Sequence, residues 1–313
     1  MKVKNKKGET EKFGHNKRLI YVAIAIITIL IPAVFFFFFY PNQPSQPKAA
    51  IIDQLSSSQL APAIRHPNQT FIETAKELLY KRFSIVDYYS DNATVDQYER
   101  LSSAGYRLII WRAHSALDLN SKYIAISTSD KYGLKNYDQY LENEQLTLCN
   151  ITGDPHLYFG ITPKFVKELM SGRFEDTVII LMSCNGLKDG YYKTAYAFEE
   201  KGVKVFISWD RWINPSDNDH AITLLLQYLI NENNTVSGAV GKIPLYSSEW
   251  GQSQLRCDPL SSEVADYRIP NFKQSGVTSN VGFMITAILR KIETRAESTQ
   301  VRVLGLHWDK LAG

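Results

Sequence analysis

The stretch that decides the fold is T-V-I-I-L-M-S-C-N-G, residues Thr177 to Gly186. Apolar residues from Val178 to Met182 lead directly to Cys184, and the Asn-Gly pair that follows favours a turn. A short apolar run bounded by turn residues is typical of a strand buried on both faces of a parallel sheet. Because such sheets present their functional groups at the carboxyl ends of the strands, we expect Cys184 at an edge of the sheet.

Helix and strand patterns alternate around this stretch, which predicts an α/β fold with a mostly parallel sheet flanked by helices. Further buried strands are predicted at Phe83–Tyr89, Tyr106–Ala113 and Val203–Trp209. Helices are predicted at Ala50–Leu60, Phe71–Arg82, Val95–Ala104, Pro163–Met170, Lys193–Lys201, Asp219–Ile230 and Val236–Lys242. Between residues 122 and 161 the pattern changes, and strands at Tyr123–Thr128 and Gln145–Asn150 predict a hairpin insertion.

Charge is spread unevenly along the 313 residues, whose net charge is +3. Residues 1–18 carry seven Lys and Arg against two Glu, a net of +5, so the remainder carries −2. No basic stripe remains after residue 18, which argues against a nucleic-acid partner. The apolar fraction of 44% and charged fraction of 21% are ordinary for a folded protein.

The uncharged segment 19–40 is 22 residues long, enough for one transmembrane helix in a lipid bilayer. The basic residues 1–18 predict a cytoplasmic tail by the positive-inside rule, so the main domain is expected outside the cell membrane. The segment is long for a signal peptide and no A-x-A-like cleavage site follows it, which favours a retained signal-anchor. A Pro-rich linker, residues 41–48, leads to an α/β domain at 49–243 and a C-terminal extension at 244–313, expected to pack on the same domain. In that extension, Val281–Ala296 predicts a helix and Thr299–Leu306 a strand.

Two features agree with an extracytoplasmic domain. Glycosylation sequons of the form N-x-[ST] begin at Asn68, Asn92, Asn150 and Asn233. The three cysteines allow two interpretations. Either Cys149 and Cys257 form a disulfide and leave Cys184 as a free reactive thiol, or all three remain thiols in a reducing compartment.

A histidine follows the strand Tyr106–Ala113 in the way that Cys184 follows its own strand. His114 is expected at the same sheet edge, and neighbouring strands lie only about 5 Å apart. An imidazole so close to a thiol is the pairing that nucleophilic cysteine catalysis requires, with the histidine as base. Each residue alone has an ordinary structural explanation, as a buried thiol or a strand-end histidine.

The order strand-His, strand-Cys-x-Gly, helix, G-V-K-V-F-I-S-W strand and amphipathic helix resembles the caspase-haemoglobinase fold of clan CD cysteine peptidases. Ala197–Val240 is similar to the stretch that follows the catalytic cysteine in CHAT and gingipain-type domains, and the resemblance covers about residues 70–243. It implies His114 as general base, Cys184 as nucleophile, and an oxyanion hole from the backbone amides of Ser115 and Cys184. Many members have glycine where this chain has Ser115.

Substrate contacts are expected from the strand after Cys184. Asp210 ends that strand and is a candidate partner for an Arg or Lys of a substrate, with Trp209 beside it. The alternative for Asp210 is a surface or helix-cap carboxylate, and for Trp209 it is packing. No metal-ligand spacing, P-loop or G-x-G-x-x-G motif occurs, so no cofactor is expected.

These features predict a membrane-anchored peptidase-like protein that performs acyl transfer on peptide or protein substrates with a Cys-His dyad. The alternative is a catalytically inactive caspase-like ectodomain that serves as a binding or scaffold module. The oligomeric state does not follow from the sequence.

Overall fold

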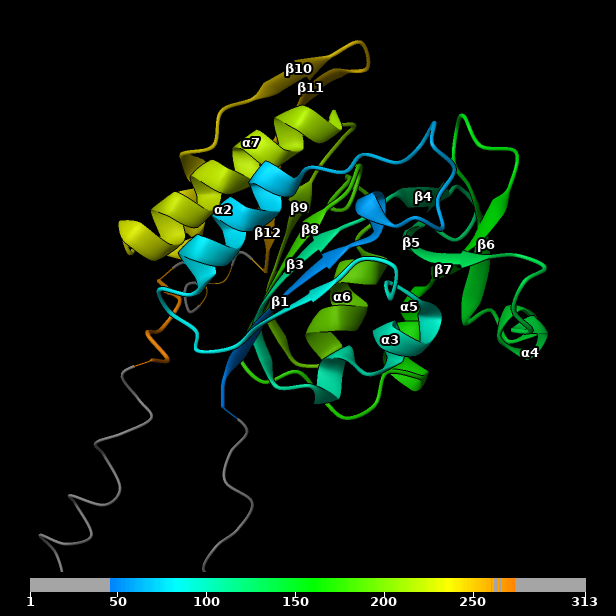
Figure 1. Ribbon diagram of the computed structural model, residues 1–313, viewed down its shortest axis with the longest axis horizontal. Helices are drawn as coiled ribbons and strands as arrows, with labels where there is room; N and C mark the ends of the chain where they lie inside the picture. Colours follow the sequence, from blue (N-terminus) through cyan, green and yellow to red (C-terminus); the bar gives the residue numbers. More distant parts are fainter. Residues whose placement is uncertain (1–45, 260, 262–263, 265, 274–313) are drawn as a thin grey trace, which may run out of the picture. The chain divides into compact units, whose positions relative to one another are not determined.

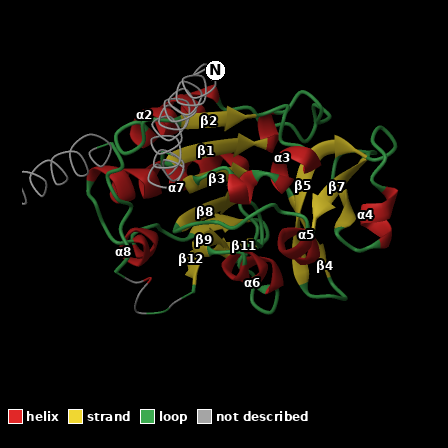
Figure 2. Ribbon diagram, turned by 90° about the horizontal axis from the view of Figure 1, so that it is seen from below, coloured by secondary structure: helices red, strands yellow, loops and turns green. Residues whose placement is uncertain are grey.

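A computed structural model describes residues 46–259, 261, 264 and 266–273 of the chain. Its centre is a six-stranded sheet in the order β12-β9-β8-β3-β1-β2 (Figures 1 and 2). Five of the strands, β9, β8, β3, β1 and β2, run parallel, and only β12 pairs antiparallel, with β9. The strands are β1 Lys48–Asp53, β2 Val86–Tyr89, β3 Tyr106–Arg112, β8 Thr177–Met182, β9 Val203–Trp209 and β12 Leu255–Asp258. The predicted α/β fold with a mostly parallel, helix-flanked sheet is confirmed.

The strand β8 lies in the middle of this sheet and is buried along its whole length. Val178, Ile180 and Met182 pack into one apolar cluster, with α2 Gln69–Leu79, α7 Pro215–Leu226 and α8 Val236–Gly241. Ile179 and Leu181 pack into a second cluster on the opposite face. That face is covered by α3 Val95–Glu99, α5 Pro163–Glu168 and α6 Lys193–Glu200 (Figure 1). Burial on both faces is why this run lacks the alternation of a half-exposed strand.

Local sequence signals explain where the helices begin. Asn68 precedes α2, and its side-chain oxygen accepts a hydrogen bond from the Phe71 N–H at 3.1 Å. Thr162 caps α5 in the same way, with Pro163 at the first helical position. A π-helical turn, Gln227–Asn231, extends α7, so the predicted helix Asp219–Ile230 is confirmed with one irregular turn at its end.

The insertion between β3 and β8 forms a second sheet, four-stranded and antiparallel, in the order β4-β5-β7-β6. Its strands are β4 Ser115–Asp118, β5 Tyr123–Lys131, β6 Leu146–Asn150 and β7 Leu157–Ile161, with the short helix α4 Asp138–Glu142 between β5 and β6. In Figure 1 this sheet lies beside the main sheet, past the carboxyl end of β3. The predicted strands β5 and β6 are confirmed, whereas β4 and β7 are additional to the prediction.

One prediction in the fold is wrong. The segment Ala50–Leu60 is not a helix, because its first residues belong to β1 and only a 3₁₀ turn, Gln54–Ser56, follows. Residues 49–52 are completely buried between β2 and β3, so an apolar run that also fits helical spacing is used as a central strand. Such short runs do not distinguish strand from helix by periodicity.

The C-terminal extension contributes a hairpin of β10 Tyr246–Ser248 and β11 Gly251–Ser253, and then β12 of the main sheet. The elements expected at Val281–Ala296 and Thr299–Leu306 lie outside the described residues, as do the basic tail, the segment 19–40 and most of the linker. Among the helices that the structure describes, none combines the length and apolar character needed to cross a bilayer.

Candidate active site

The structure brings the ends of β3 and β8 together at one edge of the main sheet. The two strands are neighbours, and Arg112 pairs with Met182 in their parallel register. His114 and Cys184 are each two residues beyond that pair, so both emerge at the same edge. The loops also touch directly, because the Ser115 hydroxyl donates a hydrogen bond to the Cys184 carbonyl at 2.6 Å.

His114 is held at three of its four polar groups. Its backbone N–H donates to Gln54 Oε1 at 3.0 Å, and its carbonyl accepts from the Ser127 N–H at 2.9 Å. Its ring Nε2 lies 2.8 Å from the Ile64 carbonyl. A carbonyl can only accept, so Nε2 carries the proton and Nδ1 is left with a free lone pair. No hydrogen bond within the described part of the chain occupies Nδ1.

The surroundings of this ring keep it neutral. Burial lowers the pKa of His114 to about 4, and the neighbouring His66 and Arg112 act in the same direction. The His66 ring meets it edge-on, with 6.1 Å between centroids. Burial also lowers the pKa of His66. At neutral pH His114 is therefore an unprotonated base rather than an imidazolium ion.

The Cys184 thiol is partly buried at the start of a tight turn. Its Sγ lies 3.6 Å from the Ile213 carbonyl, and burial raises the pKa of the thiol. The next residue, Asn185, has a φ of 61° and donates its N–H to the Arg211 carbonyl at 2.9 Å. After it comes Gly186, where a Cβ would overlap the Ser208 hydroxyl on β9, so only glycine fits. The turn thus fixes the backbone of Cys184, and burial keeps its side chain a neutral thiol.

Ser115 occupies the position where the family resemblance implies glycine, and its backbone φ is not in the left-handed region that favours glycine. It is the first residue of β4, in extended conformation, and its Cα partner is Ile126 on β5. Because Ser127 N–H bonds to the carbonyl of His114, Ser115 occupies a non-hydrogen-bonded position of this pair, with its N–H directed away from β5. An outward N–H on the edge strand β4, beside Cys184, is a suitable donor for an oxyanion.

A buried ion cluster lies directly behind these loops. Arg112 donates through Nε and Nη2 to the two carboxylate oxygens of Asp219, at 2.7 and 2.8 Å, and through Nη1 to Asp53 at 2.8 Å. The amide of Asn68 adds a hydrogen bond to Asp219 at 2.8 Å. The cluster joins the end of β1, the end of β3 and helix α7, and no sequence motif indicated it.

The two residues predicted to contact substrate have structural roles instead. Asp210 forms an ion pair with Arg256 at 2.9 Å and accepts a hydrogen bond from the Gln254 N–H at 2.8 Å. Trp209 is completely buried, and its Nε1 donates to Asn218 Oδ1 at 2.9 Å. Neither side chain is free to receive a substrate group, because β12 and α7 cover them. We therefore correct both assignments.

The cysteines and sequons also have defined places. All three cysteines are free thiols, so the predicted disulfide between Cys149 and Cys257 is not formed. Cys149 lies on β6 of the small sheet and Cys257 on β12 of the main sheet. Of the four predicted glycosylation sites, Asn68 uses its amide as a helix cap and as a partner of Asp219. The other three are exposed: Asn92, Asn150 and Asn233.

Two exposed tryptophans lie next to the thiol loop. Trp212 precedes Ile213, whose carbonyl contacts Cys184, and Trp250 comes from the β10–β11 hairpin. They are 46% and 64% exposed, and their ring centroids lie 6.0 Å apart. Because Trp250 is 66 residues from Cys184 in sequence, only tertiary structure brings it here.

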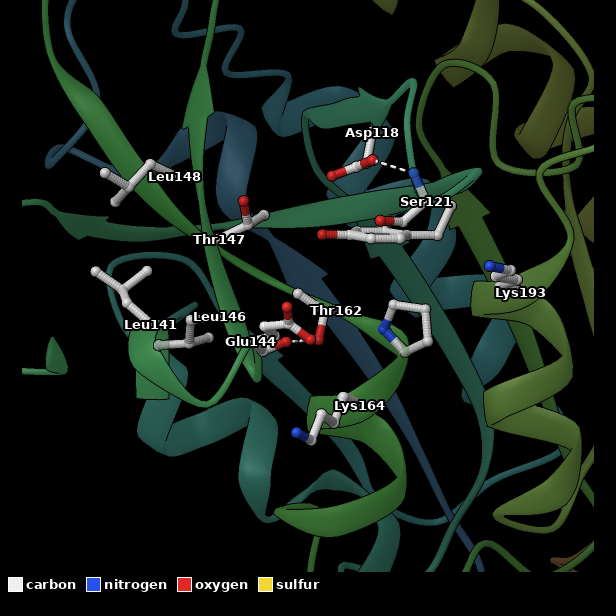
Figure 3. A pocket seen from close by; sticks show the side chains of 12 residues that line it. Asp118, Ser121, Leu141, Glu144, Leu146, Thr147, Leu148, Thr162, Lys164 and Lys193 are labelled. Carbon is white, nitrogen blue, oxygen red and sulfur yellow. Dashed lines mark hydrogen bonds between the residues drawn. The ribbon is translucent and has the colours of Figure 1, made fainter. Parts of the chain in front are cut away.

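A cavity of about 620 Å³ lies elsewhere, on the small sheet (Figure 3). It is lined by Asp118, Glu144, Lys164 and Lys193 together with polar and apolar side chains of β5 and β6. Neither His114 nor Cys184 lines it. Among the described residues, no group of three or more His, Cys, Asp or Glu is arranged to hold a metal ion. Comparison of the sequence with models of protein families and with curated proteins finds no match.

Proposed function

We propose that this protein is a membrane-anchored, extracytoplasmic cysteine peptidase with a caspase-like fold, in which Cys184 is the nucleophile and His114 the general base. The observation that carries the proposal is the placement of both residues at the ends of adjacent parallel strands, with the loops joined through Ser115 and Cys184. The mostly parallel sheet with helices on both faces agrees with the architecture that the family resemblance implies. The anchor is residues 19–40, inferred from their apolar sequence.

The protonation states favour a base-assisted mechanism. Cys184 is a neutral thiol and His114 a neutral imidazole at physiological pH. In the first step Nδ1 of His114 accepts the thiol proton as the sulfur attacks the substrate carbonyl carbon. The oxygen of the tetrahedral intermediate accepts hydrogen bonds from the Ser115 and Cys184 amides. His114 then returns the proton to the leaving amine, and a water molecule, deprotonated by the same ring, hydrolyses the thioester.

In this mechanism the Sγ turns from the Ile213 carbonyl toward His114 as it attacks an electrophile, whether the substrate carbonyl or an alkylating reagent. Catalytic hydrogen bonds are often long or misaligned in a free enzyme and tighten in the substrate complex. Trp212 and Trp250 provide an apolar surface on the same side of the thiol, suited to a bulky side chain of a peptide substrate.

The test is alkylation of Cys184 by iodoacetamide in the full chain, measured by peptide mass spectrometry. His114→Ala is expected to lower the rate at pH 7 by about tenfold or more, since general-base assistance contributes on the order of 10²–10⁴ in enzymes. His220→Ala is the matched control, because His220 is an exposed histidine on α7 outside the dyad. Equal rates for the wild type and His114→Ala, at the level of a free thiol, would reject the peptidase.

One observation favours the second candidate, an inactive ectodomain that binds a partner. The thiol hydrogen of Cys184 is directed to the Ile213 carbonyl, and burial keeps its pKa raised. For such a module, Cys184→Ala leaves partner binding intact, whereas Trp212→Ala reduces it. A peptidase loses turnover in Cys184→Ala altogether.

A further inference from the structure

Gln54 is a completely buried polar side chain immediately after β1, a position that sequence analysis assigned to a helix. A buried amide destabilises the fold unless both of its ends are hydrogen-bonded. Here Oε1 accepts from the His114 N–H at 3.0 Å, and Nε2 donates to the Thr128 carbonyl at 3.2 Å. Both partners are backbone groups, 60 and 74 residues away in sequence. Gln54 therefore ties the end of β3 to β5 at the residue we assign as general base.

The same short segment of chain holds the His114 ring. Ile64, ten residues after Gln54, accepts the hydrogen bond from Nε2 at 2.8 Å. The segment is closed on itself, because the His66 N–H donates to the Leu55 carbonyl at 2.8 Å and Arg65 Nε donates to the Ser56 carbonyl at 3.1 Å. Residues 54–66 thus contact His114 at its backbone through Gln54 and at its ring through Ile64.

These contacts set the direction of the remaining nitrogen. With the backbone N–H and Nε2 both fixed, the ring has one orientation, and that orientation determines where the Nδ1 lone pair lies. Loss of the hydrogen bond between Gln54 Oε1 and the His114 N–H would let the His114 peptide rotate, and the ring would then move relative to Cys184 Sγ. A displacement of about 1 Å at a reacting group is enough to reduce a rate on the order of 10²-fold.

We infer that Gln54 is a positioning residue of the proposed peptidase: it acts through His114, by clamping the backbone of the base between β1 and β5. This inference rests on the proposed function, since it concerns the same dyad. Gln54 itself contacts neither the thiol nor the substrate in this mechanism. Its whole effect on reactivity passes through the position of His114.

The experiment measures the rate of Cys184 alkylation at pH 7 in the full chain, with Gln54→Met as the first variant. Methionine keeps the length and volume of the side chain but makes neither hydrogen bond. Gln145→Met is the matched control, because Gln145, just before β6, is also buried and loses one side-chain hydrogen bond, to Glu168 on α5. We expect the Gln54→Met rate to fall about tenfold or more and the Gln145→Met rate to stay within twofold of wild type.

A double-mutant cycle separates positioning from a general loss of structure. In the His114→Ala background, Gln54→Met should change the alkylation rate less than twofold, because the base through which Gln54 acts is gone. If Gln54→Met lowers the rate equally with and without His114, Gln54 is merely structural and the inference is overturned. If His114→Ala slows alkylation but Gln54→Met does not, the inference fails while the proposed peptidase stands. If His114→Ala itself has no effect, both fail.

Gln54→Glu provides a second measurement should Gln54→Met fold poorly. A protonated carboxyl group at this position can accept from the His114 N–H and donate to the Thr128 carbonyl, as the amide does. An ionised one can only accept, and it lies beside the Asp53 carboxylate. The quantity to compare is the alkylation rate of Gln54→Glu divided by the wild-type rate at the same pH. We therefore expect this ratio to be near one at acidic pH and to fall as the introduced carboxyl group ionises. A ratio that is constant across pH would overturn the inference.

Discussion

Replacement of Arg112 by methionine tests the buried ion cluster behind the proposed active site. Arg112, Asp53 and Asp219 have side chains only 1%, 0% and 6% exposed. The substitution removes three charge-assisted hydrogen bonds of 2.7 to 2.8 Å and leaves two carboxylates buried without their cation. Breaking a buried ion pair from one side costs about 3–5 kcal/mol, because the remaining charge is neither solvated nor paired. We expect the free energy of unfolding to fall by about that amount.

The assay is urea unfolding of the full chain in detergent, followed by tryptophan fluorescence, which reports the buried Trp111 and Trp209. Arg107→Met is the control, because Arg107 pairs with Glu175, whose side chain is 77% exposed. That surface pair should contribute at most about 1 kcal/mol. An Arg112→Met variant no less stable than Arg107→Met would show that the cluster does not hold β1, β3 and α7 together.

Three further predictions concern titration and packing. Burial lowers the pKa of His114 from 6.5 to about 4, so the unfolded chain binds this proton more readily than the folded chain. The free energy of unfolding should therefore fall by about 3 kcal/mol as the pH is lowered from 6.5 to 4. His114→Gln should make this fall smaller, as measured by urea unfolding. Burial and the Asp258 carboxylate raise the pKa of Glu199 to about 7. Stability should therefore decline as pH rises from 4.5 through 7, and Glu199→Gln should flatten this decline. Gly186→Ala places a Cβ on the Ser208 hydroxyl, and should lower the thermal midpoint, with a cost of about 1–3 kcal/mol.

Much of the fold could be predicted because its elements carry local signals. The run from Val178 to Met182 is short, apolar at every position and followed by the turn pair Asn185 and Gly186, a combination that favours a strand covered on both faces. Thr162 and Pro163 mark the start of α5 by capping chemistry alone. The misassigned segment Ala50–Leu60 lacked such a signal, since an apolar run followed by polar residues fits either a central strand or a helix.

The position of His114 and Cys184 at one sheet edge could be predicted for a related reason. His114 and Cys184 each follow an apolar run, and parallel strands deliver the residues after them to one edge. Their partners could not be predicted, because Gln54 and Ile64 act through contacts 50 to 60 residues away. Trp250 likewise reaches Trp212 only because a hairpin folds over the loop after β9.

The sequence by itself determined an α/β sheet with a thiol and an imidazole at the ends of two buried strands. Periodicity and strand-end position are properties of neighbouring residues, so one sequence suffices to infer them. Tertiary structure alone decided which groups are free to react. It paired the Asp210 carboxylate with Arg256, buried Trp209 and kept Cys149 and Cys257 on different sheets. Among the described residues, it also left Nδ1 of His114 without a hydrogen-bond partner. Hydrogen bonds and ion pairs join residues that are far apart in the chain, and no local pattern records them.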